Sequence, residues 1–353
     1  PKTISWHLDN QFNSNPVISG SEIFDPINDI VIDNNILYVA RKSFVEKYDV
    51  STAFIEMKYT TEFIDISEIY TNSKSIGISQ DKRLYMLDNI RHLIYIYQEN
   101  PTTNLIECIG RWGTLGGPTD KQGFYKPNQI IVHNDRVYVC DSGNKVIKQF
   151  SLQGNWMRTY DFSSELPSDA SILGMCIDYN NNIHVLTDQG IIKIIVTLTK
   201  NIIKFTSIDF NSSPIKILTN YDGKMLYVCC KKQVYVISLD NEVVSSFAEI
   251  DPYSYVDTNE YVSITTDKTG TIYLTDGKYI FKYLDIPDVL EIRNNTVDSC
   301  FWSREQIYID PTEFVSEWVY NRSMRRMAEN VDILFRSMEN KIEIFVTATT
   351  KPK

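Results

Sequence analysis

Apolar residues recur along most of the chain in short runs separated by polar turns, and this rhythm predicts a protein built from strands. A triplet with one central residue between two apolar ones returns six times, five times with tyrosine at its centre and once with histidine. The six copies are Leu37-Tyr38-Val39, Leu84-Tyr85-Met86, Val137-Tyr138-Val139, Ile183-His184-Val185, Leu226-Tyr227-Val228 and Ile272-Tyr273-Leu274. Their centres lie 43 to 53 residues apart, so the chain carries an internal repeat.

Each repeat contains more than its triplet. An apolar run such as 130–132 comes first, a polar turn such as 133–135 follows, and a third run and a weaker fourth run come after the triplet. Asparagine is common in these turns, where it tolerates the positive φ that scarce glycine would otherwise supply. Four short strands repeated at this interval are typical of a β-propeller blade. The triplets are apolar on both faces, which suits a middle strand packed between neighbouring blades. We therefore expect an all-β fold, a six-bladed β-propeller over residues 21–295.

The third repeat carries a more specific pattern. Its residues are Gly110-Arg111-Trp112-Gly113, Gly116-Gly117, Gly123-Phe124, Pro127, the run Val137 to Asn144, Phe150 and Gly154. This pattern resembles an NHL repeat, with a glycine-rich entry, an apolar strand, an Asp-Ser-Gly-Asn turn and a closing Phe and Gly. The first repeat matches in part, with Pro26 and Tyr38-Val39-Ala40. The resemblance implies a six-bladed propeller, a fold that includes binding scaffolds, lactonases and lyases, so it does not choose a function.

Three segments lie outside the repeats: residues 1–20, a linker at 296–311, and the C-terminal segment 312–353. The first alternates from Thr3 to Leu8 and is a candidate for a strand that closes the ring. In the C-terminal region, Asp310-Pro311-Thr312-Glu313 has the residue types that begin helices. Apolar residues then recur in steps of three and four, which predicts a long helix over 311–339. The alternation of 342–347 predicts a short strand after it.

The apolar stripe of this predicted helix is the candidate partner-binding surface. Its members, with one adjacent arginine, are Phe314, Trp318, Tyr320, Met324, Arg325, Met327, Val331, Leu334 and Met338. Such a stripe either packs on the propeller wall or meets another protein chain, and its methionines favour the second interpretation. Residues 313–331 also resemble helical segments of tailed-phage virion proteins. That resemblance implies a structural protein of the virion, in the tail or baseplate, that is assembled in the host cytoplasm. The partners would be copies of the chain itself or other virion proteins.

Composition narrows the possible partners. With 35 Lys and Arg against 45 Asp and Glu, the net charge of −10 argues against general nucleic-acid binding. No apolar run approaches the roughly 20 residues of a membrane span. Residues 1–10 lack a signal-peptide pattern, so we expect a virion or otherwise cytoplasmic protein. The six cysteines form no C-x-x-C pair, and we expect most of them to be buried, reduced thiols.

Candidate chemistry is sparse. The four histidines form no metal-binding motif, and neither a G-x-S-x-G turn nor a phosphate loop is present. We therefore predict no catalytic residue, no cofactor and no metal, and a non-enzymatic structural and interaction protein. The alternative is a calcium-dependent hydrolase of the lactonase type, with Asn28, Asp29 and Asn128 as candidate channel ligands. A third hypothesis is a sugar- or peptide-binding propeller, with the aromatic residues Trp112, Tyr253 and Tyr255 as candidates.

Overall fold

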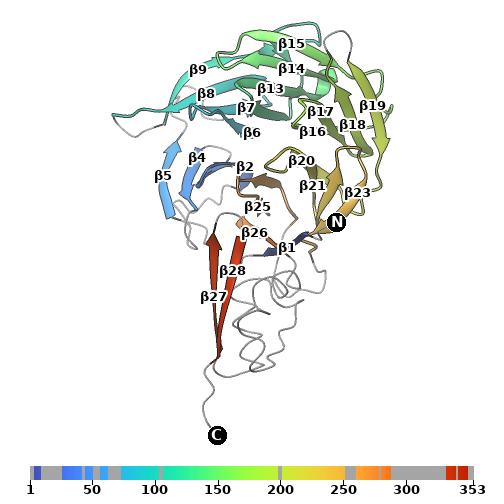
Figure 1. Cartoon of the computed structure of the whole chain (residues 1–353). Helices are drawn as coiled ribbons and strands as arrows, with labels where there is room; N and C mark the ends of the chain where they lie inside the picture. The colour runs from blue at the N-terminus through green and yellow to red at the C-terminus, as the bar shows by residue number, and fades with distance from the viewer. Residues whose placement is uncertain are drawn as a thin grey trace.

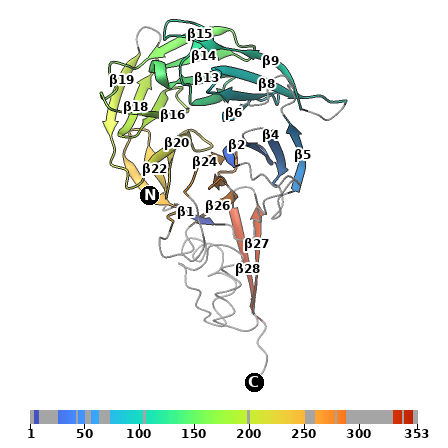
Figure 2. The ribbon, with the colours of Figure 1, turned by 180° about the vertical axis from the view of Figure 1, so that it is seen from behind.

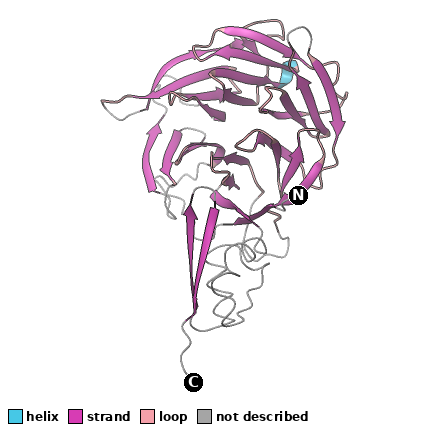
Figure 3. Cartoon of the chain, in the orientation of Figure 1, coloured by secondary structure: helices cyan, strands magenta, loops and turns pink. Residues whose placement is uncertain are grey.

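A computed structural model gives the fold. It describes residues 4–8, 26–41, 44–50, 56–62, 73–102, 106–197, 201–250, 260–277, 280–287, 331–338 and 341–348. Strands make up nearly all of the regular structure in these ranges, with one 3-10 turn at Ser142–Asn144 (Figure 3). No helix among these residues is long and apolar enough to cross a membrane.

Six four-stranded antiparallel sheets follow one another along the chain and form the blades of a ring (Figures 1 and 2). Blade 1 contains β2 (Ile27–Asp33), β3 (Ile36–Arg41), β4 (Phe44–Asp49) and β5 (Glu56–Glu62). Blade 2 contains β6 (Ser73–Ile78), β7 (Leu84–Asp88), β8 (Leu93–Glu99) and β9 (Ile106–Trp112). Blade 3 contains β12 (Gln129–His133), β13 (Arg136–Asp141), β14 (Val146–Ser151) and β15 (Trp156–Asp161).

The second half of the ring repeats this order. Blade 4 contains β16 (Ile172–Ile177), β17 (Ile183–Thr187), β18 (Gly190–Ile195) and β19 (Ile202–Ser207). Blade 5 contains β20 (Pro214–Thr219), β21 (Met225–Cys230), β22 (Val234–Ser238) and β23 (Val243–Phe247). Blade 6 contains β24 (Ser263–Thr266), β25 (Ile272–Thr275) and β26 (Ile280–Pro287). A small two-stranded sheet, β10 (Thr114–Leu115) with β11 (Gly123–Phe124), lies in the connection between blades 2 and 3.

The N-terminal strand completes the ring. Strand β1 (Ile4–Leu8) pairs antiparallel with β26, with Trp6 opposite Asp285, and becomes the outermost strand of blade 6. The last blade therefore joins segments from both ends of the repeat region. This pairing covers the edge of β26, which would otherwise present unpaired backbone groups.

Apolar contacts between blades form the core, as the triplets predict. Each triplet lies on a middle strand. The buried triplet residues include Tyr85, Leu226 and Tyr273. One cluster joins Tyr85 and Leu87 of blade 2 to Phe150 of blade 3. Comparable clusters lie at other seams, the contact surfaces between adjacent blades. A blade therefore buries its apolar faces only against its neighbours.

Polar side chains shape the turns that follow the innermost strands. In blade 4, Asp178 Oδ1 accepts hydrogen bonds from the backbone amides of Asn180 and Asn182, both at 2.9 Å. Asn34, Asn134 and Asn181, each in the turn after an innermost strand, have positive φ. Asparagine therefore does replace glycine in these turns.

The C-terminal segment differs from the sequence prediction where the structure describes it. Val331–Met338 is strand β27, and it pairs with β28 (Lys341–Ala348) in a separate two-stranded sheet. The prediction of helix was therefore wrong for 331–338, and residues 311–330 lie outside the described part. The sequence of this segment also contains a strand pattern beside the helical one. β-branched and aromatic residues alternate at Val331, Ile333 and Phe335, and this segment can pair with the alternating strand that follows.

We predict that deleting residues 1–8 destabilises the ring. Five residue pairs of β1 and β26 would be lost, and the edge of β26 would be exposed. The free energy of unfolding should fall by about 2–5 kcal/mol, because each lost backbone hydrogen bond contributes about 1 kcal/mol. Urea unfolding measures this loss, and removal of 349–353 serves as the control. Equal stability of the two shortened chains would contradict the role of β1 as the closing strand.

Candidate functional site: the axial channel

The innermost strand of every blade borders a channel along the ring axis. These strands are β2, β6, β12, β16, β20 and β24, and together they line a cavity of about 400 Å³. Half-buried apolar side chains such as Val31, Ile131 and Leu218 contribute to its wall. Each innermost strand has one paired neighbour, so its other backbone edge faces the axis. The turns that follow these strands form the mouth of the cavity.

One position in each innermost strand is equivalent by register, because it lies opposite the second residue after the triplet centre. The six positions, here named the polar belt, are Asp29, Ser75, Gln129, Gly174, Lys216 and Ser263. In β2, β6, β16 and β20 the register shifts just before this position, so the strand bulges there. Gln129 and Lys216 also line the cavity, which makes the belt its floor.

Asp29 is the most connected member of the belt. Its Oδ1 accepts hydrogen bonds from the Lys216 ammonium and the Ser263 hydroxyl, both at 2.5 Å, and from its neighbour's amide at 3.0 Å. Its Oδ2 accepts from the Ser75 hydroxyl and the Ile76 amide, both at 2.9 Å. Five donors therefore surround a carboxylate that is only 3% exposed, and they tie blade 1 to blades 2, 5 and 6.

The belt continues in the same direction through blades 2 to 4. Ser75 Oγ accepts a hydrogen bond from the Ile130 amide at 3.3 Å, and Gln129 Oε1 accepts one from the Met175 amide at 2.5 Å. Each of these side chains therefore binds an edge amide of the next blade. A Cβ at position 174 would lie 2.3 Å from Gln129 Oε1, so glycine there leaves room for this amide group.

Lys216, Ser263 and Asp29 superficially resemble a hydrolytic centre. Lys216 Nζ lies 3.0 Å from Ser263 Oγ, but a Ser–Lys hydrolase needs a neutral lysine that accepts the hydroxyl proton. Here the lysine donates to both Ser263 and Asp29, while the serine hydroxyl donates to the carboxylate. A carboxylate offers about four lone-pair sites, and five donors already use those of Asp29. The arrangement favours cohesion of the ring over proton transfer.

The candidate calcium ligands do not form an open cage. The Lys216 ammonium occupies the place beside Asp29 that a cation would take. Asn128 Nδ2 donates to the Ile172 carbonyl at 2.7 Å, which links blade 3 to blade 4, and its buried Oδ1 has no hydrogen-bond partner. Asn28 also makes polar contacts. Within the described ranges, no group of three His, Cys, Asp or Glu side chains could hold a metal ion.

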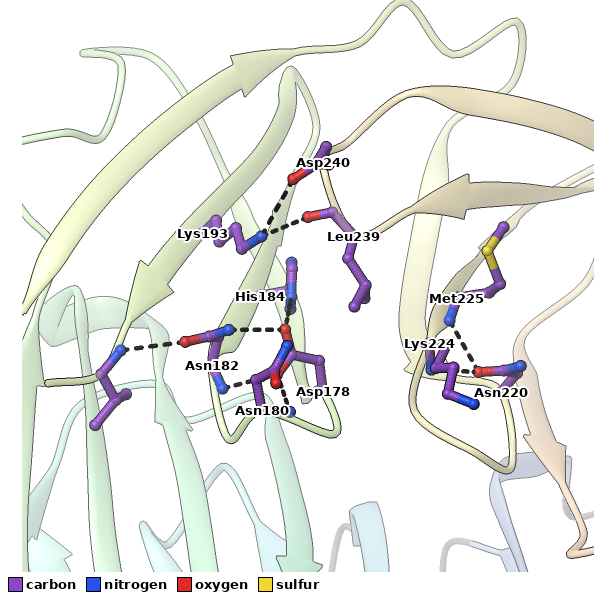
Figure 4. Close-up of polar contacts among 11 residues, drawn as sticks. Asp178, Asn180, Asn182, His184, Lys193, Asn220, Lys224, Met225, Leu239 and Asp240 are labelled. Atoms are coloured by element: carbon purple, nitrogen blue, oxygen red, sulfur yellow. Dashed lines mark hydrogen bonds and ion pairs between the residues drawn. The ribbon is translucent and has the colours of Figure 1, made fainter.

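His184, which stands where the other triplets have tyrosine, contacts the buried carboxylate of Asp178 (Figure 4). Its Nε2 lies 3.0 Å from Asp178 Oδ2, which also accepts a hydrogen bond from Asn182 Nδ2 at 3.1 Å, and both His184 and Asp178 are fully buried. Burial opposes the charge of Asp178, but the hydrogen bonds from His184 and Asn182 outweigh it and lower the pKa of Asp178. The histidine therefore fixes a turn of blade 4.

The motif of the third repeat also has a structural role. Lys148 is fully buried, with Nζ 3.1 Å from Asp141 Oδ2, and it donates to the Asp120 carbonyl at 2.8 Å. Asn144 Nδ2 donates to the Gly116 carbonyl at 2.9 Å. These residues hold the glycine-rich connection between blades 2 and 3 against blade 3. These contacts give Asp141, Asn144 and Gly116 of the NHL-like pattern a structural role.

The cysteines largely match the expectation of buried thiols. Cys140, Cys176, Cys229 and Cys230 are buried and free, and burial raises the pKa of Cys230 to about 12. Cys108 on β9 is also free but is exposed.

The remaining candidates fall into two groups. Trp112 is half-buried, with its ring centroid 6.1 Å from that of Tyr85 and 5.9 Å from that of Phe150, so it belongs to a seam between blades and is no loop-exposed aromatic. Val331, Leu334 and Met338 lie on strand β27. Outside the described residues lie Tyr253, Tyr255, Phe314, Trp318, Tyr320, Met324, Arg325, Met327 and Cys300.

Comparison with known proteins supports the fold alone. No protein-family model and no curated protein matches the chain, so the likeness to NHL repeats remains an expectation from sequence. The chain resembles a streptogramin B lyase structure with a TM-score of 0.51 and 13% identity, over 80% of this chain and 97% of the other. It resembles a catalytically inactive virginiamycin B lyase from Staphylococcus aureus with quinupristin at 0.50 and 14%, over 80% and 88%. These likenesses support a six-bladed β-propeller.

We predict that Asp178→Asn lowers the free energy of unfolding by about 1–3 kcal/mol at neutral pH, because buried hydrogen bonds to a charged group are lost. The carboxyl pKa is lowered from its ordinary 3.8, so the contribution is present above that value and disappears as the pH falls through the folded-state pKa. The difference between wild type and variant should therefore stay constant down to about pH 5 and shrink below pH 3.8. Urea unfolding across this range measures it.

The matched control is Asp135→Asn, at an exposed turn aspartate. That change should alter stability by less than about 0.5 kcal/mol at every pH. A difference for Asp178→Asn that persists unchanged into strong acid would contradict the assignment.

Proposed function

We propose that this protein is a non-enzymatic interaction protein, a rigid propeller that its C-terminal segment 312–353 attaches to a larger assembly. The observation that carries this proposal is the polar belt. Its charged and hydroxyl groups bind one another and the edge amides of neighbouring blades. A propeller whose axial polar groups are used in this way is suited to present its surfaces rigidly.

A calcium-dependent hydrolase has less support from the same geometry. A cation that bound Asp29 would have to displace the Lys216 ammonium, which lies 2.5 Å from Oδ1. Ser263 would have to give up its hydrogen bond to the carboxylate before it could act as a nucleophile. Both changes would remove the hydrogen bonds through which Asp29 links blade 1 to blades 5 and 6.

The C-terminal segment is the proposed attachment site. Strands β27 and β28 pair with each other and join none of the six blades, so the described part of this segment adds no strand to the ring. We propose partners that are further copies of the chain or other proteins of a particle. The resemblance of 313–331 to phage virion segments is the support for a tailed-phage particle.

Truncation after residue 300 tests the proposed attachment. The shortened chain retains all six blades, including β1, and should keep its circular dichroism spectrum and its cooperative unfolding. It should lose the self-association or particle incorporation of the full chain, which sedimentation velocity measures. An unfolded product would mean that the segment belongs to the core, and unchanged association would place the attachment elsewhere.

Calcium provides the test against a hydrolase. Millimolar calcium and a chelator should leave the unfolding temperature of the full chain unchanged, because Lys216 already neutralises Asp29.

Lys216→Met should lower the free energy of unfolding by about 3–5 kcal/mol, because it leaves a buried carboxylate without its cation. A calcium-dependent rise in unfolding temperature that Asp29→Asn abolishes would support the hydrolase instead.

A further inference from the structure

We infer that the mouth of the axial cavity is a binding site for a neutral saccharide, with the ring of Tyr221 as its stacking surface. This inference goes beyond the proposed assembly role. It concerns the face of the ring formed by the turns after the innermost strands, and it makes no use of the C-terminal segment. It rests on the shape of the cavity, the side chains at its mouth and the charge balance there.

The cavity has the size and character of a small-molecule site. Its volume of about 400 Å³ falls within the roughly 300–1,000 Å³ of typical ligand pockets. The wall combines apolar side chains with the backbone edges of six strands, and the polar belt forms the floor. A ligand that enters from the mouth therefore meets an apolar wall. Its hydrogen-bonding partners must come from side chains at the mouth, because the belt groups already bind one another and the edge amides of neighbouring blades.

Tyr221 is the tyrosine among the described residues that line the cavity. It lines the cavity and is 59% exposed. Its ring lies beside the turn of blade 6, where a Cβ on Gly270 would be 3.3 Å from Cδ1. Glycine at 270 thus leaves room for the ring next to the backbone. An exposed tyrosine placed in this way offers a flat contact surface at low entropic cost.

Amide side chains complete the recognition surface. Gln80 of blade 2 and Asn34 of blade 1 line the same mouth. Blades 2 and 5 are three apart in a ring of six, so Gln80 lies across the mouth from Tyr221. A primary amide offers two donors and one acceptor oxygen, which matches neighbouring sugar hydroxyls. A pyranose ring also has an apolar C–H face, which suits an aromatic ring.

The charges at the mouth point to a neutral ligand. Asp33 forms an ion pair with Lys82, and Lys268 together with Asp267 adds one charge of each sign. Burial lowers the pKa of His133, which also lines the mouth, so its ring is neutral near pH 7. The charged side chains that line the cavity, counted with their ion-pair partners, therefore cancel and favour neither an anionic nor a cationic ligand.

Saturation-transfer NMR on the full chain tests the inference. The probes are neutral hexasaccharides of glucose, N-acetylglucosamine and mannose, with a hyaluronan hexasaccharide as the anionic comparison and a tyrosine-rich peptide as the protein-like one. At least one neutral probe should bind, with transfer to its ring C–H protons. Tyr221→Ala should weaken that binding by at least about tenfold, and Tyr221→Phe should keep it within about twofold.

The matched control is Tyr125→Ala. Tyr125 is 43% exposed and precedes β12, at the opposite end of that strand from the mouth. This change should leave binding unaltered, and circular dichroism should show that all variants are folded. The inference is overturned by the absence of binding to every neutral probe at millimolar concentration, by preferred binding of hyaluronan or the peptide, or by equal loss in the Tyr125→Ala variant. Each of these results is independent of the truncation experiment on the C-terminal segment.

Discussion

The carboxylate of Asp29 is the constraint on which the ring depends. A buried charge is tolerated only when donors surround it, because removing an ion from water without partners costs several kcal/mol. The donors of Asp29 come from its own strand and from blades 2, 5 and 6. Those blades must therefore take fixed positions around blade 1 before the carboxylate is satisfied. Gln129 makes an equivalent link from blade 3 to blade 4 with an uncharged side chain.

This belt supplies what the apolar seams cannot. Hydrophobic burial is non-directional and supplies most of the energy that holds one blade on the next. The seam clusters of blades 2 and 3, or of blades 5 and 6, therefore favour contact without fixing how far one strand slides along its neighbour. A hydrogen bond from an edge amide to a side chain of the preceding blade does fix that position. Bulges precede Asp29 and Ser75 in their strands, and both side chains accept such hydrogen bonds from the next blade.

The repeat made the middle strands and the number of blades predictable. Each triplet consists of apolar residues on both faces, and such residues indicate a buried strand without any knowledge of distant contacts. The polar belt was not predictable, since Asp, Ser, Gln, Gly, Lys and Ser share no residue type and only the register shows that they are equivalent. The C-terminal prediction failed over 331–338 because two periodicities overlap there. Pairing with Lys341–Ala348 is the long-range contact that favours the strand, and a local pattern does not contain it.

The belt also sets the electrostatic character of the cavity above it. Asp29 and Lys216 cancel at the floor, as Asp33 and Lys82 do at the mouth, although the whole chain carries a net charge of −10. A neutral cavity in an acidic protein exerts little pull on ions of either sign, because the opposite charges of each pair screen each other at close range. Affinity at such a site must come from shape, stacking on Tyr221 and hydrogen bonds to amides. The ion pair that holds the ring together is thus also the reason why a neutral ligand suits its channel.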